Sequence, residues 1–402
     1  MDLGGGLGHL TYSTLVHPGD TWAEMNDSIR RFLPAVKAAH SPDAPFAFSL
    51  RLSAASAAEL AADAERRAEL TDWLRNEGLY LITANAFPYG AFKGGPVKER
   101  VYEPDWSTDQ RRHYTTQVAE ILAELAPPGV APSIQTAPLA FAPRVEGPGY
   151  VEAFTRNVLA VVAALVDIER RTGRTVRLAI EPEPYCYLAT TPQTVEYFRT
   201  RLYSAEAART LAELADLALS SAHGALRRHV GVVFDICHQA VEFEDIAESL
   251  ELLADAGIPV FKLQEAAALW IPEVDRESVD ELEKYADTIY LTQTTELRNG
   301  VLRRFLNIED AIAAWRQDPG PCEWRTHFHV PVFLDDLGPF RTTQFAIRDA
   351  LAVHRRRPVS DHLEIETYTF DVLPDHLRTG GIVEYVIREL DWVRTELGVG
   401  AG

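Results

Sequence analysis

Short apolar runs that end in polar residues recur along this chain, and they constrain its fold more than any other feature. Runs that are apolar at successive positions are typical of parallel strands covered on both faces. Seven such runs fall in the first two thirds of the chain: HLTYS (9–13), FAFSLRL (46–52), LYLITANAF (79–87), PSIQTAP (132–138), VRLAIEPE (176–183), VGVVFDICH (230–238) and PVFKLQEA (259–266).

Amphipathic helical patterns lie between these runs. The apolar residues of 22–36 recur at spacings of three and four, which places them in one stripe on a helix. Thr21 with Glu24 has the pattern of a capping box before that helix, and Ser107 with Gln110 repeats it before the segment VAEILAELA. The alternation of strands and helices predicts an α/β sheet or barrel.

The spacing of the strand ends favours a barrel. Asp235 and Gln264 are 29 positions apart, close to one-eighth of the roughly 250 residues of an eight-unit barrel. Three later runs raise the number of candidate strands to ten: TIYLTQ (288–293), THFHVPVF (326–333) and HLEIETYTF (362–370). We expect the last run to close the barrel and the other two to belong to a long insertion between strands 7 and 8, at about 288–340. The prediction is a single (β/α)8 TIM-barrel domain over residues 1–402.

The composition excludes several classes of function. With 39 basic and 59 acidic side chains the formal net charge is -20, which disfavours nucleic acid as a partner. No apolar stretch approaches the roughly 20 residues that span a bilayer, and the N-terminus lacks the pattern of a signal peptide. Cys186, Cys237 and Cys322 are too scattered for a disulfide framework. We therefore expect a cytoplasmic protein that binds neither nucleic acid nor a membrane. Its oligomeric state, monomer or dimer, is left open.

The polar residues of the strand ends form the candidate site, because parallel strands of a barrel direct their carboxyl ends at one face. They are His9, Asn85, Gln135, Glu181, Glu183, Asp235, His238, Gln264, His329, Glu364 and Glu366. Three acidic strand ends in one barrel would repel one another, and a divalent cation would reconcile them.

Three of the acidic strand-end residues have a structural alternative. A lone buried carboxylate at Glu181 would cost on the order of several kcal/mol, and an ion pair with Arg177 or a neighbouring lysine would also offset that cost. Glu183 has the same strand parity and could lie at the rim. Asp235 could cap the next segment, with His238 packed against it.

The candidates with amide, ammonium and imidazole side chains also have both a functional and a structural explanation. Gln264 could ligate a metal or be a hydrogen-bonded core amide, while Lys262, of the same parity, could contact substrate or pair with a carboxylate. His327 and His329 alternate onto one strand face, as a metal pair or an ordinary hydrogen-bonded pair would.

Several motifs resemble those of a known family. IEPE, FDICH, FKLQ and LEIETY resemble the xylose-isomerase-like barrels, which include sugar and cyclitol isomerases and epimerases and the endonuclease IV group. Longer stretches are similar to the EboE family of metabolite traffic proteins, and this likeness runs along nearly the whole chain. These stretches are HLTYSTLVHPGDTW, NAFPYGAFKG, VKERVYEPDW, IEPEPYCYLATT, FDICHQAVEFED, THFHVPVF and HLEIETYTFDVLP.

The resemblance implies a divalent metal ion (Mn, Mg, Zn or Fe) at the carboxyl face of the barrel. The implied ligands are Glu181, Asp235, Gln264 and Glu366. Gln264 stands where the epimerases usually have an imidazole, and Glu364 is the alternative to Glu366. His238 matches the imidazole of the family's D-x-x-H motif, which is placed to touch substrate or metal.

The sequence thus predicts a metal-dependent isomerase or epimerase of a sugar, sugar phosphate or cyclitol. Glu181 and Glu366 would take and return a carbon-bound proton. His238 would steady the oxygen on which charge develops, and Lys262 would assist. The other candidates would bind substrate: His9, Asn85, Gln135, Glu183, His329 and Glu364. The alternatives are a metal-dependent hydrolase or iron oxygenase, and a non-catalytic carrier of a small polar metabolite.

Overall fold

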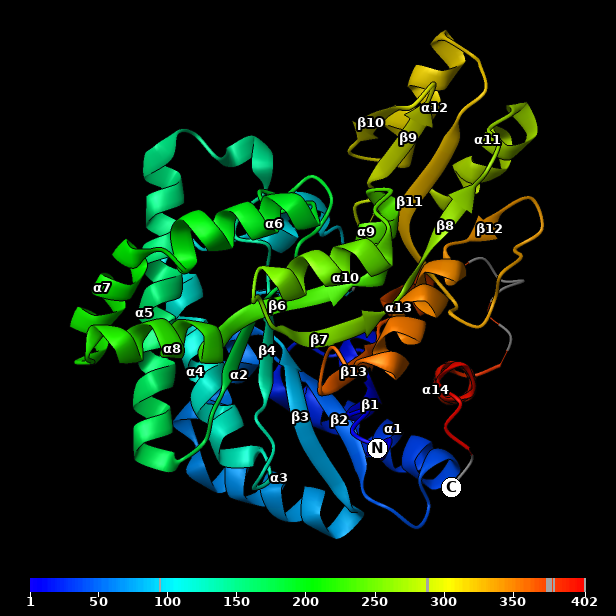
Figure 1. The fold of residues 1–402 in the computed structure, drawn as a ribbon. Helices are drawn as coiled ribbons and strands as arrows, with labels where there is room; N and C mark the ends of the chain where they lie inside the picture. Colours follow the sequence, from blue (N-terminus) through cyan, green and yellow to red (C-terminus); the bar gives the residue numbers. More distant parts are fainter. Residues whose placement is uncertain (94, 287–288, 374–377, 379, 401–402) are drawn as a thin grey trace.

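Eight parallel strands form the central sheet of the protein (Figure 1). The computed structural model describes residues 1–93, 95–286, 289–373, 378 and 380–400. The strands are β1 (His9–Tyr12), β2 (Phe46–Arg51), β3 (Leu79–Asn85), β4 (Ser133–Thr136), β5 (Arg177–Ile180), β6 (Val230–Asp235), β7 (Val260–Glu265) and β13 (His362–Ile365). All eight coincide with the runs from which the sequence predicts the barrel.

The sheet closes on itself as a barrel. Its order is β1-β13-β7-β6-β5-β4-β3-β2, so β1 pairs with the last strand, and a parallel bridge from Ser13 to Ser49 joins β1 to β2. The predicted (β/α)8 barrel is therefore confirmed, with HLEIETYTF as its eighth strand. The carboxyl ends of all eight strands lie at one end of the barrel, where the candidate site is expected.

Helices surround the barrel, except α11 (Arg276–Leu282) and α12 (Ile308–Gln317), which lie beside the second sheet formed between β7 and β13 (Figure 1). The other α-helices are α1 (Trp22–His40), α2 (Ala54–Ala62), α3 (Ala64–Glu77), α4 (Asp109–Leu125), α5 (Pro148–Thr172), α6 (Thr191–Tyr197), α7 (Ala205–Ala215), α8 (Leu219–His229), α9 (Ile236–Val241), α10 (Ile246–Asp255), α13 (Gln344–Arg356) and α14 (Ile382–Leu397). The short 3-10 and π segments are η1 (Thr14–Val16), η2 (Lys98–Tyr102), η3 (Ala142–Arg144), η4 (Phe198–Leu202), η5 (Glu283–Tyr285) and η6 (Tyr368–Val372). Helix α14 packs against α1, which brings the two ends of the helical layer together.

The start signals predicted for two helices have different outcomes. Helix α1 begins with the capping box of Thr21 and Glu24, as predicted, and buries its apolar stripe against the barrel. The capping box predicted at Ser107 is wrong, because Thr108 is the N-cap of α4 and accepts the hydrogen bond of the Arg111 amide. The Ser107 hydroxyl instead donates to Asp105.

A second sheet lies between β7 and β13 in the chain and extends away from the barrel (Figure 1). Its five antiparallel strands have the order β10-β9-β11-β8-β12. They are β8 (Ala267–Ile271), β9 (Thr294–Arg298), β10 (Val301–Phe305), β11 (Glu323–Val330) and β12 (Arg341–Thr342). This sheet starts at Ala267, earlier than the expected 288. The candidate strand TIYLTQ is wrong, since 289–293 precede β9 as an irregular segment, and residue 288 lies outside the described residues.

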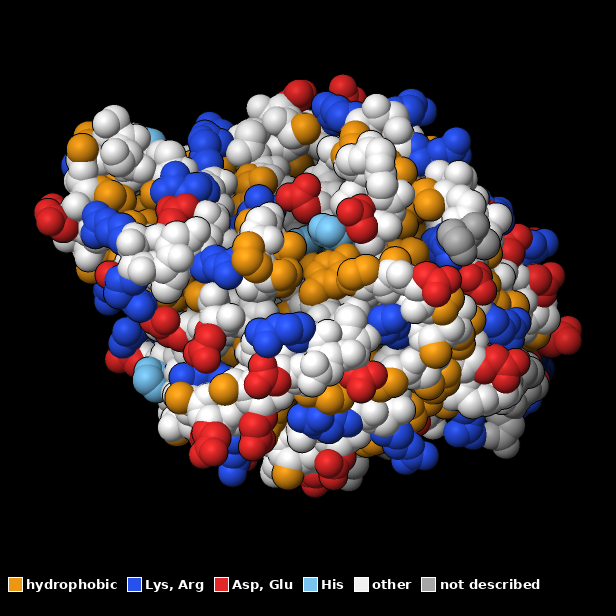
Figure 2. Space-filling view, turned by 90° about the horizontal axis from the view of Figure 1, so that it is seen from below, with side chains coloured by type: hydrophobic (Ala, Val, Ile, Leu, Met, Phe, Trp, Pro, Cys, Tyr) orange, Lys and Arg blue, Asp and Glu red, His pale blue; other side chains and the backbone are white. Residues whose placement is uncertain are grey.

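The structure also shows the distribution of surface charge, the length of the helices and the state of the cysteines. Acidic and basic side chains are interspersed on the face shown in Figure 2. Within the described parts of the chain, no helix is both long and apolar enough to cross a membrane. The three cysteines Cys186, Cys237 and Cys322 are buried and free.

Candidate metal centre and pocket

Three buried carboxylates meet at the carboxyl end of the barrel. Glu181 directly follows β5, Asp235 is the last residue of β6, and Glu366 directly follows β13. One carboxylate oxygen of each lies within 4.8 Å of the others, and the three residues are at most 5% exposed. Parallel strands that end at one face thus bring together side chains that are far apart in the sequence.

The amide of Gln264 lies in the middle of these carboxylates. Its Nε2 is 2.6 Å from Asp235 Oδ2, 2.7 Å from Glu366 Oε2 and 3.1 Å from Glu181 Oε1. An amide nitrogen has two hydrogens, so it cannot satisfy three acceptors at once. Its Oε1 is buried without a hydrogen-bond partner among the described residues. The centre is therefore short of positive charge and of donors.

Neighbouring strands supply further donors to the carboxylates. Ser13 Oγ and Asn85 Nδ2 donate to Glu366 Oε1 over 3.2 and 3.0 Å. Gln135 Nε2 donates to Glu181 Oε2 over 2.7 Å. These bonds fix the outer oxygens and leave the inner ones directed at the centre.

The surroundings change the proton affinity of the site. Burial, followed by the charges of Glu366 and Asp235, raises the pKa of Glu181 well above its usual range. Burial, with the charges of Glu364 and Asp235, raises the pKa of Glu366 to about 8. Burial also raises the pKa of Asp235. A cation bound at the centre would compete with these protons.

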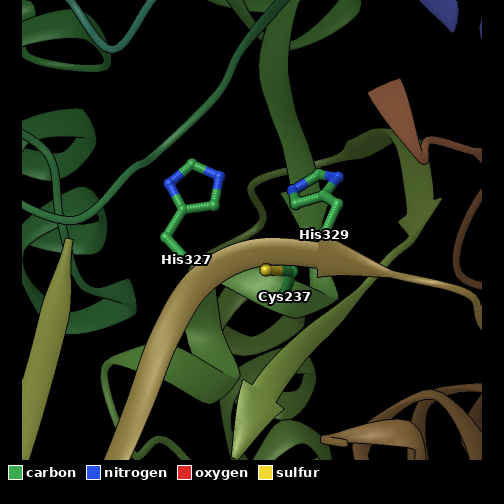
Figure 3. Close-up of side chains that lie close together, drawn as sticks. All are labelled: Cys237, His327 and His329. Carbon is green, nitrogen blue, oxygen red and sulfur yellow. The ribbon is translucent and has the colours of Figure 1, made fainter. Parts of the chain in front are cut away.

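Three histidines lie beside the carboxylate centre. His238 comes from α9, and His327 and His329 come from β11 of the second sheet. Figure 3 shows the rings of His327 and His329 projecting from β11, with Cys237 of α9 nearby. Burial lowers the pKa of His238 and of His329 to about 4 and lowers the pKa of His327 well below its usual range, so the imidazoles are neutral at neutral pH.

Glu183 forms the link between the histidines and the pocket wall. It accepts hydrogen bonds from Tyr102 Oη over 2.7 Å and from Gln293 Nε2 over 3.1 Å. Burial raises the pKa of Glu183 to about 8, although both of these hydrogen bonds oppose the shift. Glu183, His238 and His327 each offer a ligand atom within 4.8 Å of the other two.

A pocket opens above the carboxylate centre and the neighbouring histidines. Its lining includes side chains from both: Glu181, Glu183, His238, His327 and Glu366. Phe92, Tyr290 and Tyr368 form an aromatic wall, with ring centroids 4.8 to 5.3 Å apart. A mostly apolar pocket with a few converging polar groups is typical of a small-molecule site.

The residues at the centre fit a divalent cation. Glu181, Asp235 and Glu366 offer carboxylate oxygens, and a turned amide of Gln264 would bring its unpartnered Oε1 to the same place. Oxygen ligands of this kind suit Mg²⁺, Mn²⁺ and Ca²⁺ better than softer metals. The alternative prediction for Asp235, that it caps the following segment, is also correct, because its Oδ1 accepts a hydrogen bond from the His238 amide at the start of α9.

Two predicted site residues lie below the pocket. Lys262 and Glu364 form a fully buried ion pair of 3.0 Å, and Lys262 Nζ also donates to Gln135 Oε1 over 2.7 Å. Each precedes a centre residue on its strand by two positions, so its side chain points inward one layer deeper. Lys262 therefore fulfils the second of its two predicted alternatives, the pairing with a carboxylate. The predicted contact of Glu364 with substrate is wrong, because Glu364 is fully buried and does not line the pocket. Lys262 also supports Glu181 through Gln135.

His9 and the Arg177 alternative are also corrected. His9 is the first residue of β1, so it lies at the amino end of the barrel, where Nδ1 is 2.9 Å from Tyr80 Oη. Its predicted place in the substrate site is therefore wrong. Arg177 pairs with Asp361 at 3.0 Å, at the same amino end, and so does not neutralise Glu181.

The remaining predicted residues lie at the expected face. Asn85, Gln135 and Glu183 line the pocket, whereas His329 is fully buried beside two lining residues, His327 and Tyr368. Sequence reasoning missed Tyr102, Gln293 and Tyr368. Gln293 carried a signal, since it is the polar end of the run TIYLTQ, but that run was assigned no part in the site.

Comparisons with known proteins find similar solved structures of low sequence identity. No family model and no curated protein matches it. The structure is similar to the IolI protein with a bound zinc atom, at 13% identity, covering 98% of this chain and 100% of that chain, with a TM-score of 0.49. It is also similar to a xylose isomerase-like TIM barrel protein from Mycobacterium smegmatis in complex with magnesium, at 10% identity, 99% and 98% coverage and a TM-score of 0.47.

A D-tagatose 3-epimerase-like protein is similar at 12% identity, with 97% of each chain covered and a TM-score of 0.44. The class of the protein rests on its own strand order and site: a (β/α)8 barrel with a buried carboxylate centre beneath a pocket. The resemblance to the EboE family stays a prediction.

Proposed function

We propose that this protein is a divalent-metal-dependent isomerase or epimerase of a small polyhydroxylated carbonyl compound, such as a sugar, sugar phosphate or cyclitol derivative. The observation that carries the proposal is the convergence of Glu181, Asp235 and Glu366 around one point, where Glu181 and Glu366 also line the pocket. Glu181, Asp235, Glu366 and the amide oxygen of Gln264 would hold the ion. When bound, the ion would polarise a substrate carbonyl group.

The protein's own groups would move the proton. Glu181 and Glu366 both reach the pocket from strands that are separated by β6 and β7, so two carboxylates can approach a substrate from different directions. One would accept the proton from the carbon next to the carbonyl group, and the proton would return to that carbon or to its neighbour. Gln135 and Asn85 would hold these two carboxylates in place through the bonds described above.

Solvent deuterium exchange tests this proposal. The manganese-loaded protein is incubated in D₂O with a panel of ketoses, their phosphates and keto-cyclitols, and carbon-bound deuterium is measured by mass spectrometry. Wild type should label at least one compound, and Glu181→Gln should lose the labelling while it keeps the far-UV circular dichroism of wild type. Labelling retained in Glu181→Gln would contradict the role of this carboxylate.

A second candidate is a metal-dependent hydrolase. The histidine cluster beside the carboxylates favours it, because two metal ions 3.5–4 Å apart are common in hydrolytic centres. Hydrolysis of a generic phosphoester without deuterium incorporation would support this candidate. Binding of a panel compound without exchange or hydrolysis would instead support a carrier.

A further inference from the structure

His238 and His327 face each other on the pocket floor. Their Nε2 atoms lie 3.2 Å apart. Such a contact has two explanations. Either one Nε2 carries a proton and donates it to the other in a hydrogen bond, or both Nε2 atoms carry a lone pair and can bind the same cation. The partners of the two Nδ1 atoms decide between these possibilities, because a neutral imidazole carries one proton.

The tautomer of His238 is set by a backbone carbonyl. Its Nδ1 lies 2.9 Å from the carbonyl oxygen of Pro182. A carbonyl oxygen can only accept, so the proton of the ring is on Nδ1. The Nε2 atom of His238 therefore presents a lone pair to His327.

The tautomer of His327 is set by Gln293. Nδ1 of His327 lies 2.9 Å from Gln293 Oε1. The orientation of this amide is fixed at its other end, where Nε2 donates to Glu183 Oε1 at 3.1 Å and to the carbonyl oxygen of Pro184 at 3.4 Å. A turned amide would place its oxygen against a carboxylate and a carbonyl group. His327 therefore also carries its proton on Nδ1 and a lone pair on Nε2.

A third imidazole has the same orientation. His329 Nδ1 lies 2.6 Å from the backbone oxygen of Glu366, and His329 Nε2 is buried without a partner among the described residues. Outer hydrogen bonds of this kind, from Nδ1 to an oxygen, orient the histidines of metal sites and leave Nε2 to bind the ion.

We propose that Glu183, His238 and His327 form a second metal site that binds a Zn²⁺-type transition-metal ion. Two imidazole nitrogens bound to one tetrahedral zinc ion are about 3.3 Å apart, given bonds of about 2.0–2.1 Å. The observed 3.2 Å between the two Nε2 atoms matches this value. Two histidines and one glutamate are a donor set of catalytic zinc, in which the fourth position stays open. All three residues line the pocket, so the open position faces a ligand there.

The two sites differ in donor chemistry. The carboxylate centre offers oxygen alone, whereas the second site offers two nitrogens and one oxygen, which favours Zn²⁺ over Mg²⁺. The second site is argued from its own contacts, and only the idea of two neighbouring metal ions rests on the proposed function of the carboxylate centre. In that arrangement β11 of the second sheet contributes a ligand, His327, that the barrel itself does not supply.

Metal stoichiometry tests the second site. The untagged full-length protein is dialysed against Zn²⁺ alone, and bound zinc is counted by elemental mass spectrometry. His327→Gln should bind one ion fewer per chain than wild type, while Glu181→Gln should retain the ion that His327→Gln loses. His354→Gln is the matched control, because His354 is also a buried histidine but bonds to Leu7 and Val359. It should bind as much zinc as wild type.

The outcomes separate the two proposals. Equal zinc in His327→Gln and wild type would overturn the second site, whatever Glu181→Gln shows. Loss of zinc in His327→Gln with no effect of Glu181→Gln would support the second site. The carboxylate centre favours oxygen-seeking ions, so it is tested separately by dialysis against Mn²⁺ alone, where Glu181→Gln should lose the bound ion. If His327→Gln does not fold, zinc-edge X-ray absorption of wild type decides. Imidazole scattering at about 2.0 Å supports the second site, and oxygen scattering alone overturns it.

Discussion

The side-chain nitrogen of Gln264 lies 2.6 Å from Oδ2 of Asp235, its neighbour across the β6–β7 pair. This amide takes the position in which a cation would meet the carboxylates of Glu181 and Glu366 as well. Without metal it is a shared donor, and with metal its oxygen is the group that can turn inward. Gln264 therefore stabilises the metal-free protein through its amide nitrogen and the metal-bound protein through its amide oxygen.

Substitutions of Gln264 should separate these effects. Gln264→Leu removes the donor and the amide oxygen, so we expect metal-free protein to lose about 1–3 kcal/mol of unfolding free energy and Mn²⁺ affinity to fall. Gln264→Glu also destabilises metal-free protein, because a fourth carboxylate adds repulsion, but it should bind Mn²⁺ more tightly than wild type. Urea unfolding in EDTA and calorimetric Mn²⁺ titration measure both. If Gln264→Leu and Gln264→Glu bound Mn²⁺ with equal affinity, the ion would not be bound beside Gln264.

Removal of metal should lower the stability of wild type. An ion that binds the folded chain stabilises it by RT ln(1 + [L]/Kd), about 2.7 kcal/mol at a free concentration of 100 Kd. We expect the melting temperature to rise with Mn²⁺ concentration and to fall after chelation. Asp235→Asn should show a much smaller dependence. A melting temperature of wild type that is independent of Mn²⁺ would contradict a metal centre in the barrel.

The buried pair of Lys262 and Glu364 should behave as a coupled unit. Both side chains are 0% exposed and lie 3.0 Å apart. Lys262→Met leaves the Glu364 carboxylate buried without its cation, so we expect a loss of about 3–5 kcal/mol. The double variant Lys262→Met/Glu364→Leu should recover most of that loss, since an apolar replacement of a buried pair is often neutral. Additive losses in a double-mutant cycle would show that the pair is not coupled.

The sequence predicts the barrel well because each barrel strand is marked by its own apolar run and polar end. It locates Glu181, Asp235 and Glu366 for the same reason. It fails at His9, where the polar residue starts a strand instead of ending it, and at Glu364, where parity gives the direction of a side chain but not its depth. The sequence also offers His327 and His329 as a metal pair, but it does not place them beside His238, because the packing of β11 against α9 is a long-range contact that no local pattern encodes.

A buried glutamate away from the pocket should make stability depend on pH. Burial raises the pKa of Glu389 from 4.5 to about 8, although hydrogen bonds from Thr367 and the Val332 amide oppose the shift. Between these values the folded chain keeps a proton that the unfolded chain has released, so a rise in pH favours unfolding. Relative to Glu389→Gln, wild type should lose up to about 1.4 kcal/mol per pH unit from pH 5 to 8. Urea unfolding in EDTA measures this difference, and parallel pH curves would contradict the shifted pKa.

The close approach of β6 and β7 should make Gly231 intolerant of a side chain. A Cβ atom at this position would lie 2.3 Å from the backbone oxygen of Pro259 and 2.9 Å from the ring of Phe261. Gly231→Ala should therefore cost about 1–3 kcal/mol through overpacking. Gly224→Ala is the control, because this position on α8 has no atom within 4 Å of the added Cβ among the described residues, and alanine stabilises a helix by about 1 kcal/mol over glycine. Chemical unfolding should give shifts of opposite sign for the two variants. A Gly231→Ala variant as stable as wild type would mean that the two strands separate at little cost, which would contradict the tight register that brings Asp235 beside Gln264.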